Sequence, residues 1–140
     1  MLNSEDEVAG GFVPWPHLRA VGDWLDDPVA VAEGLLGTPY LWGGNSRAGI
    51  DCSGLMQVAF AACGVTLPGD SDLQEAVGAE VQGALRRGDL VFWKGHVALV
   101  VDEARLIHAN GFTMSVAYED TAACIARIAV EGPVTSRRRV

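Results

Sequence analysis

The hydrophobic pattern of this chain changes its period once, and this change constrains the fold more than any other feature. Segments 27–36 and 53–63 carry apolar residues at helical spacing. The first opens with Asp before Pro and the second ends at Gly64, and both signals are typical of helix ends. From Asp89 onwards, short apolar runs alternate with turns, as in antiparallel strands. Helices followed by a meander of strands predict an α+β fold.

Short apolar runs separated by turns make up the later part of the chain. Three of them are joined by two-residue links and are predicted to pair as antiparallel neighbours: 89–93, 96–102 and 105–109. The remaining predicted elements are a strand at 115–118, a short helix over 119–124 and a last strand at 126–130. The arginines at 137–139 are predicted to be a solvated end of the chain.

Residues 1–27 differ from the rest and are predicted to form an N-terminal strap, followed by one domain over 28–140. The strap has an acidic tip and then a strand-like stretch broken by prolines. Its apolar side chains, such as Phe12 and Trp15, are too few to form a core of their own. We therefore expect the strap to lie on the main domain, and its aromatic side chains offer a surface for a homo-oligomer.

The composition argues against several classes of partner. A formal net charge of −8 over 140 residues disfavours nucleic acids and anionic membranes, which are bound through basic surfaces. No apolar run approaches the roughly 18 residues of a membrane span. The start of the chain is acidic and lacks the features of a secretory signal, and three cysteines are too few for a disulfide scaffold. We expect a cytoplasmic protein, or an exported one if a leader is missing from this sequence.

Cys52 lies where a glycine-rich loop, 40–51, meets the predicted helix 53–63. The N–H groups and partial positive charge of a helix N-terminus favour a thiolate, so we expect the pKa of Cys52 to be lowered. Its own backbone N–H is then available to stabilise an oxyanion. This position suits a nucleophile, although a lone cysteine at a helix start is more often structural.

A nucleophilic thiol needs a base, and the base needs a group that orients it. His96 begins one predicted strand and His108 lies near the end of the next, so antiparallel pairing brings the two imidazoles side by side. We expect His96 to reach Cys52, and His108 to accept the other ring N–H of His96. A histidine in an apolar strand is also commonly an ordinary core or edge residue.

Cys52, His96 and His108 admit a second interpretation, a zinc site, because cysteine and histidine both bind zinc. No Cys-x-x-Cys or His-x-x-x-His pair supports a metal, and a structural zinc needs a fourth ligand. We therefore expect neither a metal nor a cofactor. Cys63, among alanines, is interpreted as a small core residue, and His17 as non-catalytic.

Five motifs occur in order along the chain: Gly37-Thr-Pro-Tyr-Leu-Trp-Gly-Gly44, Asp51-Cys-Ser-Gly-Leu55, Leu85-Arg-Arg-Gly-Asp-Leu-Val-Phe-Trp93, Gly95-His-Val-Ala-Leu99 and Leu106-Ile-His-Ala109. Together they resemble the NlpC/P60 family of cell-wall cysteine peptidases, and the resemblance runs from about residue 29 to residue 130. It implies a compact papain-like α+β core, in which the helix of the nucleophile packs on an antiparallel sheet.

The resemblance also implies roles for individual residues. Cys52 is the nucleophile, His96 the base and His108 the third member of the triad, and the Tyr40 hydroxyl joins the Cys52 N–H at the oxyanion. In the branch that trims free murein peptides with an unblocked N-terminal L-alanine, carboxylates and hydroxyls hold the substrate ammonium. The substrate-binding positions expected here are Asp51, Ser53, Asp70, Ser71 and Trp42. For Asp70, a turn before a helix cap explains the residue nearly as well.

Members of that branch usually carry SH3-like domains ahead of the catalytic core. Residues 11–18 resemble only the closing strand of such a domain, so the strap is interpreted as its remnant. The resemblance implies hydrolysis of the γ-D-glutamyl–diamino acid bond in peptidoglycan stem peptides, with L-Ala-γ-D-Glu-diamino acid as the partner. Two alternatives remain open: a non-catalytic module that binds murein peptides in the same cleft, and an acyltransferase or amidase with the same triad.

Overall fold

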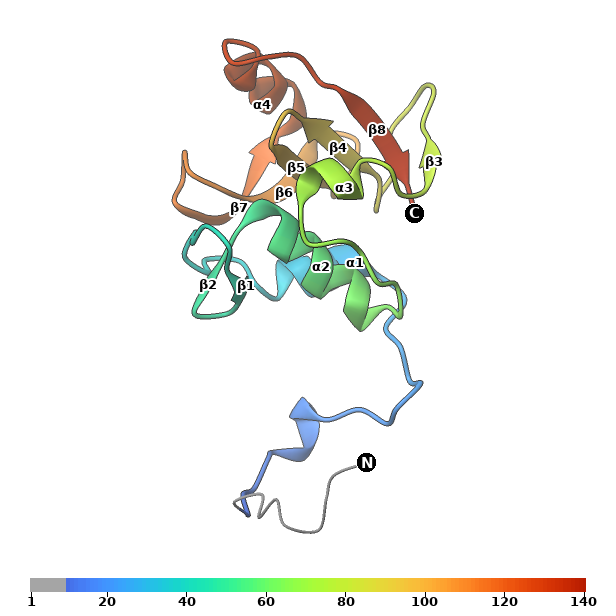
Figure 1. Ribbon diagram of the computed structural model, residues 1–140, viewed down its shortest axis with the longest axis vertical. Helices are drawn as coiled ribbons and strands as arrows, with labels where there is room; N and C mark the ends of the chain where they lie inside the picture. Colours follow the sequence, from blue (N-terminus) through green and yellow to red (C-terminus); the bar gives the residue numbers. More distant parts are fainter. Residues whose placement is uncertain (1–9) are drawn as a thin grey trace.

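A six-stranded antiparallel sheet is the centre of the molecule, with the strand order β3-β8-β4-β5-β6-β7 (Figure 1). The computed structural model describes residues 10–140. The strands of the sheet are β3 (Ala79–Glu80), β4 (Leu90–Trp93), β5 (His96–Val100), β6 (Arg105–Asn110), β7 (Ser115–Asp120) and β8 (Ser136–Arg139). A separate hairpin pairs β1 (Asn45–Ser46) with β2 (Gly49–Ile50). This arrangement confirms the α+β prediction and the predicted meander of β4, β5 and β6.

Two helices cover one face of the sheet. In α1 (Pro28–Glu33), Asp27 caps the N-terminus by accepting a hydrogen bond from the Val29 N–H at 2.9 Å. The longer α2 (Cys52–Ala62) packs against β5 and β6. Alternate strand residues point to this face, because side chains of a strand alternate between its two sides. The core so formed includes Leu55, Met56, Phe60, Phe92, Val97, Leu99 and Ile107.

A second, smaller core lies on the opposite face, beneath α4 (Thr121–Ile128). Asp120 caps this helix by accepting from the Ala123 N–H at 2.8 Å. Cys124 is fully buried against the intervening residues of the strands, among them Val91 and Leu106. The sheet is therefore covered on both sides, and the short helix α3 (Ser71–Gln74) lies beside the N-terminal end of α2.

The C-terminal part differs from the prediction made for it. Residues 126–128 continue α4 rather than forming a last strand, and the last strand is β8. The arginines at 137–139 belong to β8, which pairs with β4, and are not a solvated end. The reason is the carboxylate of Asp89, which is only 1 % exposed and accepts two hydrogen bonds from Arg139, both at 2.7 Å. A buried carboxylate needs such a partner.

We expect Asp89→Asn to lower the free energy of unfolding by about 2 kcal/mol, because hydrogen bonds to charged groups contribute about that much. Chemical denaturation followed by circular dichroism measures the change. Asp102→Asn is the matched control, since Asp102 pairs with Arg105 in the same way but both side chains are exposed. Equal losses in the two variants would mean that the Asp89 pair does not anchor β8.

The described part of the N-terminal strap leads away from the helices instead of lying on them (Figure 1). It holds one turn of 3-10 helix, η1 (Trp15–His17), in place of the expected strand-like piece. Phe12, Trp15 and Val21 are largely or fully exposed. Contact with the main domain begins at Trp24, whose ring lies against Gly64, and at Leu25, whose N–H donates to the Ala62 carbonyl at 2.9 Å. The acidic tip of the strap, residues 1–9, lies outside the described residues.

Among residues 10–140, no helix has the length and apolar character needed to span a membrane.

Candidate active site

Asp51 fixes the glycine-rich loop to the start of α2. One of its carboxylate oxygens, Oδ1, accepts from the Gly54 N–H at 2.7 Å and from the Ser53 hydroxyl at 3.2 Å. The other, Oδ2, accepts from the Gly43 N–H at 2.8 Å. Asp51 is therefore both the N-cap of α2 and the tie that holds the loop. The carboxylate that the sequence assigned to substrate is already engaged in placing Cys52, the first residue of the helix.

Gly54 allows the loop to approach α2 this closely. A Cβ atom at this position would lie 2.2 Å from the Gly44 carbonyl oxygen, which is backbone and cannot move aside. We expect Gly54→Ala to cost about 2 kcal/mol of stability, as overpacking does, and to displace Cys52 and reduce activity. Gly69→Ala is the control, because a Cβ there meets only the end of Gln57 at 3.9 Å. Thermal unfolding and activity are measured together, and a fully active, stable Gly54→Ala protein would refute this role.

The Cys52 thiol is 8 % exposed, at the edge of the core. Burial raises its pKa, and the negative charge of Asp51 acts in the same direction. Hydrogen bonding from the backbone N–H groups of Val97, Ser53 and Cys52 itself opposes these effects without outweighing them. The expected lowering of the Cys52 pKa by the helix terminus is therefore wrong for the free protein. The thiol keeps its proton at neutral pH, so a nucleophilic role requires a base that removes it.

The two predicted imidazoles do lie side by side. The Nε2 atom of His96 is 2.8 Å from the Nδ1 atom of His108, and the rings meet edge to face. Pairing of β5 with β6 ends at Leu99 and Ile107, short of the histidine end of the two strands. The side chains bridge this end of the strand pair in place of the backbone ladder. This is the arrangement expected from the sequence.

Two residues that the sequence did not indicate extend this pair. The Nε2 atom of His108 lies 2.9 Å from Oε2 of Glu119 on β7, and Arg127 of α4 donates to both oxygens of Glu119 at 2.9 and 2.8 Å. His108 is fully buried. His96, His108, Glu119 and Arg127 thus form one continuous chain of side chains across three strands and a helix.

The charge states of this chain follow from its surroundings. Burial lowers the pKa of His96 to about 3, with a contribution from the neighbouring His108, and burial also lowers the pKa of His108. The hydrogen bonds and positive charge of Arg127 lower the pKa of Glu119 to about 2. At neutral pH both imidazoles are therefore neutral and Glu119 is ionised. A neutral His96 is able to accept a proton.

Cys52 and His96 are not hydrogen-bonded to each other within the described part of the chain. Val97, which follows His96, directs its backbone N–H at the Cys52 thiol. Gly95, which precedes His96, borders both of the clefts described next. Catalytic hydrogen bonds are often long in proteins without substrate and tighten when it binds.

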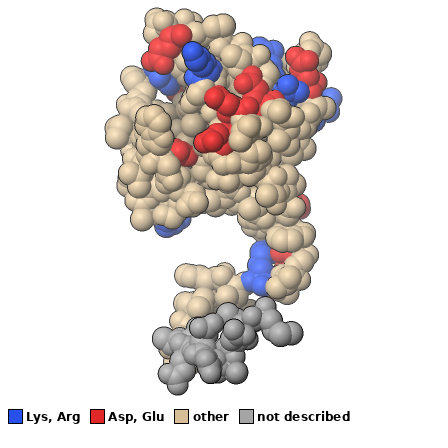
Figure 2. All heavy atoms as spheres, viewed as in Figure 1, with Lys and Arg blue, Asp and Glu red and all other residues tan. Residues whose placement is uncertain are grey.

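A cleft of about 560 Å³ opens at Cys52. It is lined by every predicted substrate-binding residue and by the predicted oxyanion residue: Trp42, Asp51, Ser53, Asp70, Ser71 and Tyr40. Gln74 holds the segment of Asp70 in place, since its side-chain amide donates to the Pro68 carbonyl at 2.8 Å and to the Ser53 carbonyl at 3.0 Å. Acidic side chains gather over this part of the surface, around α3 (Figure 2).

Tyr40 keeps its proton in this cleft. Burial raises its pKa, and the negative charge of Asp51, together with that of Cys52 once its thiol is ionised, raises it further. A protonated phenol is a hydrogen-bond donor, as an oxyanion requires. The placement of Tyr40 beside Cys52 is therefore compatible with the role that the resemblance implies.

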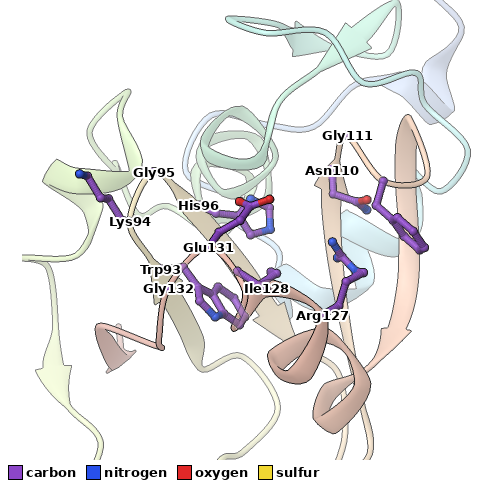
Figure 3. A pocket seen from close by; sticks show the side chains of 11 residues that line it. Trp93, Lys94, Gly95, His96, Asn110, Gly111, Arg127, Ile128, Glu131 and Gly132 are labelled. Atoms are coloured by element: carbon purple, nitrogen blue, oxygen red, sulfur yellow. The ribbon is translucent and has the colours of Figure 1, made fainter.

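A second cleft, of about 480 Å³, shares Gly95 with the first and includes His96 (Figure 3). Arg127 rises into it from α4 towards Asn110, and its guanidinium also lies 4.4 Å from the centre of the Phe112 ring. Lys94 and Glu131 add one charge of each sign to the lining. The two clefts thus meet at Gly95, with Cys52 in one and His96 in the other.

The zinc interpretation of Cys52, His96 and His108 gains no support from the geometry. Within residues 10–140, the group spaced to hold a metal is a different one, His108, Glu119 and Cys124, with ligand atoms within 4.8 Å of one another. Arg127 already occupies that place: its Nη2 atom lies 2.8 Å from Glu119 and 4.0 Å from the Cys124 sulfur. A guanidinium repels a second cation there.

Sequence comparison identifies relatives of the chain. Residues 37–128 match the NlpC/P60 family. A γ-D-glutamyl-L-lysine dipeptidyl-peptidase of Bacillus cereus is 37% identical over an alignment of 93 positions that covers 60% of this chain and 28% of that protein. The chain spans about a third of the length of the curated relatives that it matches.

Solved structures with a similar fold also include NlpC/P60 proteins. The peptidoglycan hydrolase RipB of Mycobacterium tuberculosis has a TM-score of 0.69 at 30% identity, covering 80% of this chain and 62% of that one. An NlpC/P60 family protein of Bacillus cereus has a TM-score of 0.68 at 30% identity, covering 81% and 39%. These matches confirm the resemblance that the sequence motifs indicated. The chain belongs to the NlpC/P60 family.

Proposed function

We propose that this chain is a cysteine endopeptidase that hydrolyses the γ-D-glutamyl–diamino acid bond of peptidoglycan stem peptides. The observation that carries the proposal is the position of Cys52, at the start of α2, in the cleft that contains Tyr40, which meets the cleft of His96 at Gly95. The relative named γ-D-glutamyl-L-lysine dipeptidyl-peptidase supports this choice of bond.

The reaction begins with transfer of the Cys52 proton to a nitrogen of His96 as the sulfur attacks the γ-carbonyl carbon. The Cys52 N–H and the Tyr40 hydroxyl donate to the resulting oxyanion. Collapse of this intermediate gives a thioester, and His96 protonates the departing amine. Water, deprotonated by His96, then hydrolyses the thioester and frees Cys52. No step requires a metal or a redox change.

The two clefts divide the substrate between them. The acyl half stays attached to Cys52, so it belongs in the cleft of Tyr40, Asp70 and Ser71. The leaving amine receives its proton from His96, so the diamino acid half belongs in the second cleft. Within the first cleft, Asp51 already caps α2. Asp70, which is exposed and has no side-chain cap bond, is therefore the better candidate to hold a substrate ammonium.

Blocking the substrate amine tests this assignment. We expect the wild-type protein to cleave L-Ala-γ-D-Glu-diaminopimelate, and to cleave the N-acetylated peptide at a kcat/KM at least about tenfold lower, because acetylation removes the charge that Asp70 would pair with. Asp70→Asn should reduce the preference, whereas Asp102→Asn, far along the chain on an exposed turn, should keep it. Absence of cleavage of both peptides would overturn the proposed function, and equal rates would overturn the ammonium site.

A second candidate function is binding of murein peptides without cleavage. It is favoured by one feature of the site, since the Cys52 thiol has a raised pKa and no hydrogen bond to His96 among the described residues. Calorimetry and product analysis with the same peptide separate the two functions. A binding module gives heat of binding and no product, whereas the endopeptidase releases L-Ala-D-Glu.

A further inference from the structure

Glu119 is the only described residue that joins the histidine pair to the rest of the protein through a carboxylate. Its side chain is 16 % exposed, and Arg127 holds both of its oxygens. Glu119 is also hydrogen-bonded to the Cys124 thiol, and its contact with the histidine pair, at 2.9 Å, is with Nε2 of His108. We propose that Glu119, held in place by Arg127, is a positioning residue that dictates which ring nitrogens of His108 and His96 carry protons, and so leaves His96 with an unprotonated Nδ1.

The position of each ring proton follows from assigning a donor and an acceptor to each hydrogen bond between Glu119, His108 and His96. An ionised carboxylate accepts hydrogen bonds and cannot donate them, so Nε2 of His108 must be the donor in its contact with Glu119. A neutral imidazole carries one N–H, so Nδ1 of His108 must be an acceptor. The contact between the rings, at 2.8 Å, then requires Nε2 of His96 to donate. The proton-free nitrogen of His96 is Nδ1.

The contact between the two histidines does not make this choice alone. If the protons were reversed, Nδ1 of His108 would donate to Nε2 of His96 at the same distance, and His96 would carry its proton on Nδ1. Such a ring has no free nitrogen with which to accept the Cys52 proton. Only the group on the far side of His108 distinguishes the two arrangements, and that group is Glu119.

Within residues 10–140, no other group near His108 is placed to replace Glu119. The titratable or charged groups that face the His108 ring are His96 from β5, Glu119 from β7, and Arg127 and Cys124 from α4. Arg127 donates only, and its positive charge disfavours protonation of His108. His108 has no exposed surface through which bulk water could supply an acceptor. This role deepens the proposed function, because it concerns the readiness of His96 to act as its base.

Nitrogen-15 NMR of the imidazoles tests the proposal without any substrate, because protonated and unprotonated ring nitrogens have distinct chemical shifts. We expect the wild-type protein at pH 7 to show protonated Nε2 and unprotonated Nδ1 on both His96 and His108. A wild-type His108 protonated on Nδ1 overturns the proposal by itself, whatever the variants do. This readout is also independent of the proposed function, since it requires no hydrolysis.

The matched variants are Glu119→Gln, which keeps the shape of the side chain and removes its charge, and Asp120→Asn, which weakens the cap of α4 but touches neither histidine. We expect Glu119→Gln to show a substantial population of rings protonated on Nδ1, and Asp120→Asn to match the wild type. On a peptide that the wild type cleaves, Glu119→Gln should lower kcat about 100-fold with KM little changed. Unchanged tautomers or an unchanged kcat in Glu119→Gln would overturn the role of Glu119.

Discussion

Replacement of Cys52 by alanine is expected to lower kcat by a factor on the order of 10⁴ or more, since loss of a nucleophile removes the covalent route altogether. The variant should remain folded, because the side chain is at the edge of the core and only its sulfur is removed. It should also bind the peptide, because the lining of the first cleft is otherwise unchanged. Steady-state kinetics, circular dichroism and calorimetry measure these three properties.

Cys63→Ala is the matched control for Cys52→Ala. Cys63 caps the C-terminal end of the same helix, and its thiol is likewise free. We expect this variant to keep full activity, because the end of α2 lies away from both clefts at His96 and Cys52. A Cys52→Ala protein that still cleaves the peptide at the wild-type rate would show that another residue is the nucleophile.

Tyr40→Phe is expected to lower kcat by about 10²- to 10³-fold with little change in KM, as loss of one oxyanion donor does. The hydroxyl donates to the oxyanion that forms in the transition state and has much less to bond in the ground state, so the loss falls on kcat. The phenylalanine ring keeps the lining of the cleft and removes only the donor. Steady-state kinetics separate the two constants.

The second tyrosine of the chain provides the control. Tyr118 lies on β7, and its hydroxyl donates to Oε1 of Glu33 at 2.8 Å, outside the Cys52 cleft. Tyr118→Phe removes the same group from a structural contact and should leave kcat unchanged. A wild-type kcat in Tyr40→Phe would show that the Tyr40 hydroxyl does not donate to the oxyanion. The backbone N–H of Cys52 would then be its donor.

The sequence predicts the features of this fold that depend on neighbouring residues. Asp before Pro marks the start of α1, Gly64 follows the end of α2, and Lys94-Gly95 forms the tight link between β4 and β5. These signals are local, because caps and turns are made by residues near in the chain. The placement of His96 beside His108 follows from another short link, residues 101–104 between β5 and β6.

Features that depend on residues distant in the sequence cannot be predicted from local signals. The segment Cys124–Val130 is apolar at a spacing that suits either a helix or a strand, and the second core beneath the sheet selects the helix. Three consecutive arginines are typical of a solvated end. Here Arg139 pairs with the buried Asp89, a partner 50 positions earlier that the local sequence does not reveal. Burial around Cys52, which outweighs the helix terminus in setting the thiol pKa, likewise depends on strands that come later in the chain.

Glu119 escaped prediction for a related reason. It follows the predicted strand 115–118 and begins the predicted helix 119–124, in which its side chain would not point at His108. In the structure β7 extends to Asp120, and its pairing with β6 places Glu119 opposite Leu106, one pleat from His108. The sequence feature that could have indicated this contact is a carboxylate, Glu119, in the strand that follows the strand of His108. Its use requires the register of β6 and β7, which the sequence alone leaves open.

Cleavage of the γ-D-glutamyl–diamino acid bond by Cys52 is the reaction that we propose. The most direct measurement is liquid chromatography and mass spectrometry of L-Ala-γ-D-Glu-diaminopimelate and its lysine analogue after incubation with the wild-type protein and with Cys52→Ala. We predict that the wild type releases L-Ala-D-Glu and the free diamino acid from at least one of the two peptides, and that Cys52→Ala releases neither. Release of L-Ala-D-Glu by both proteins, or of different fragments by the wild type, would contradict the account.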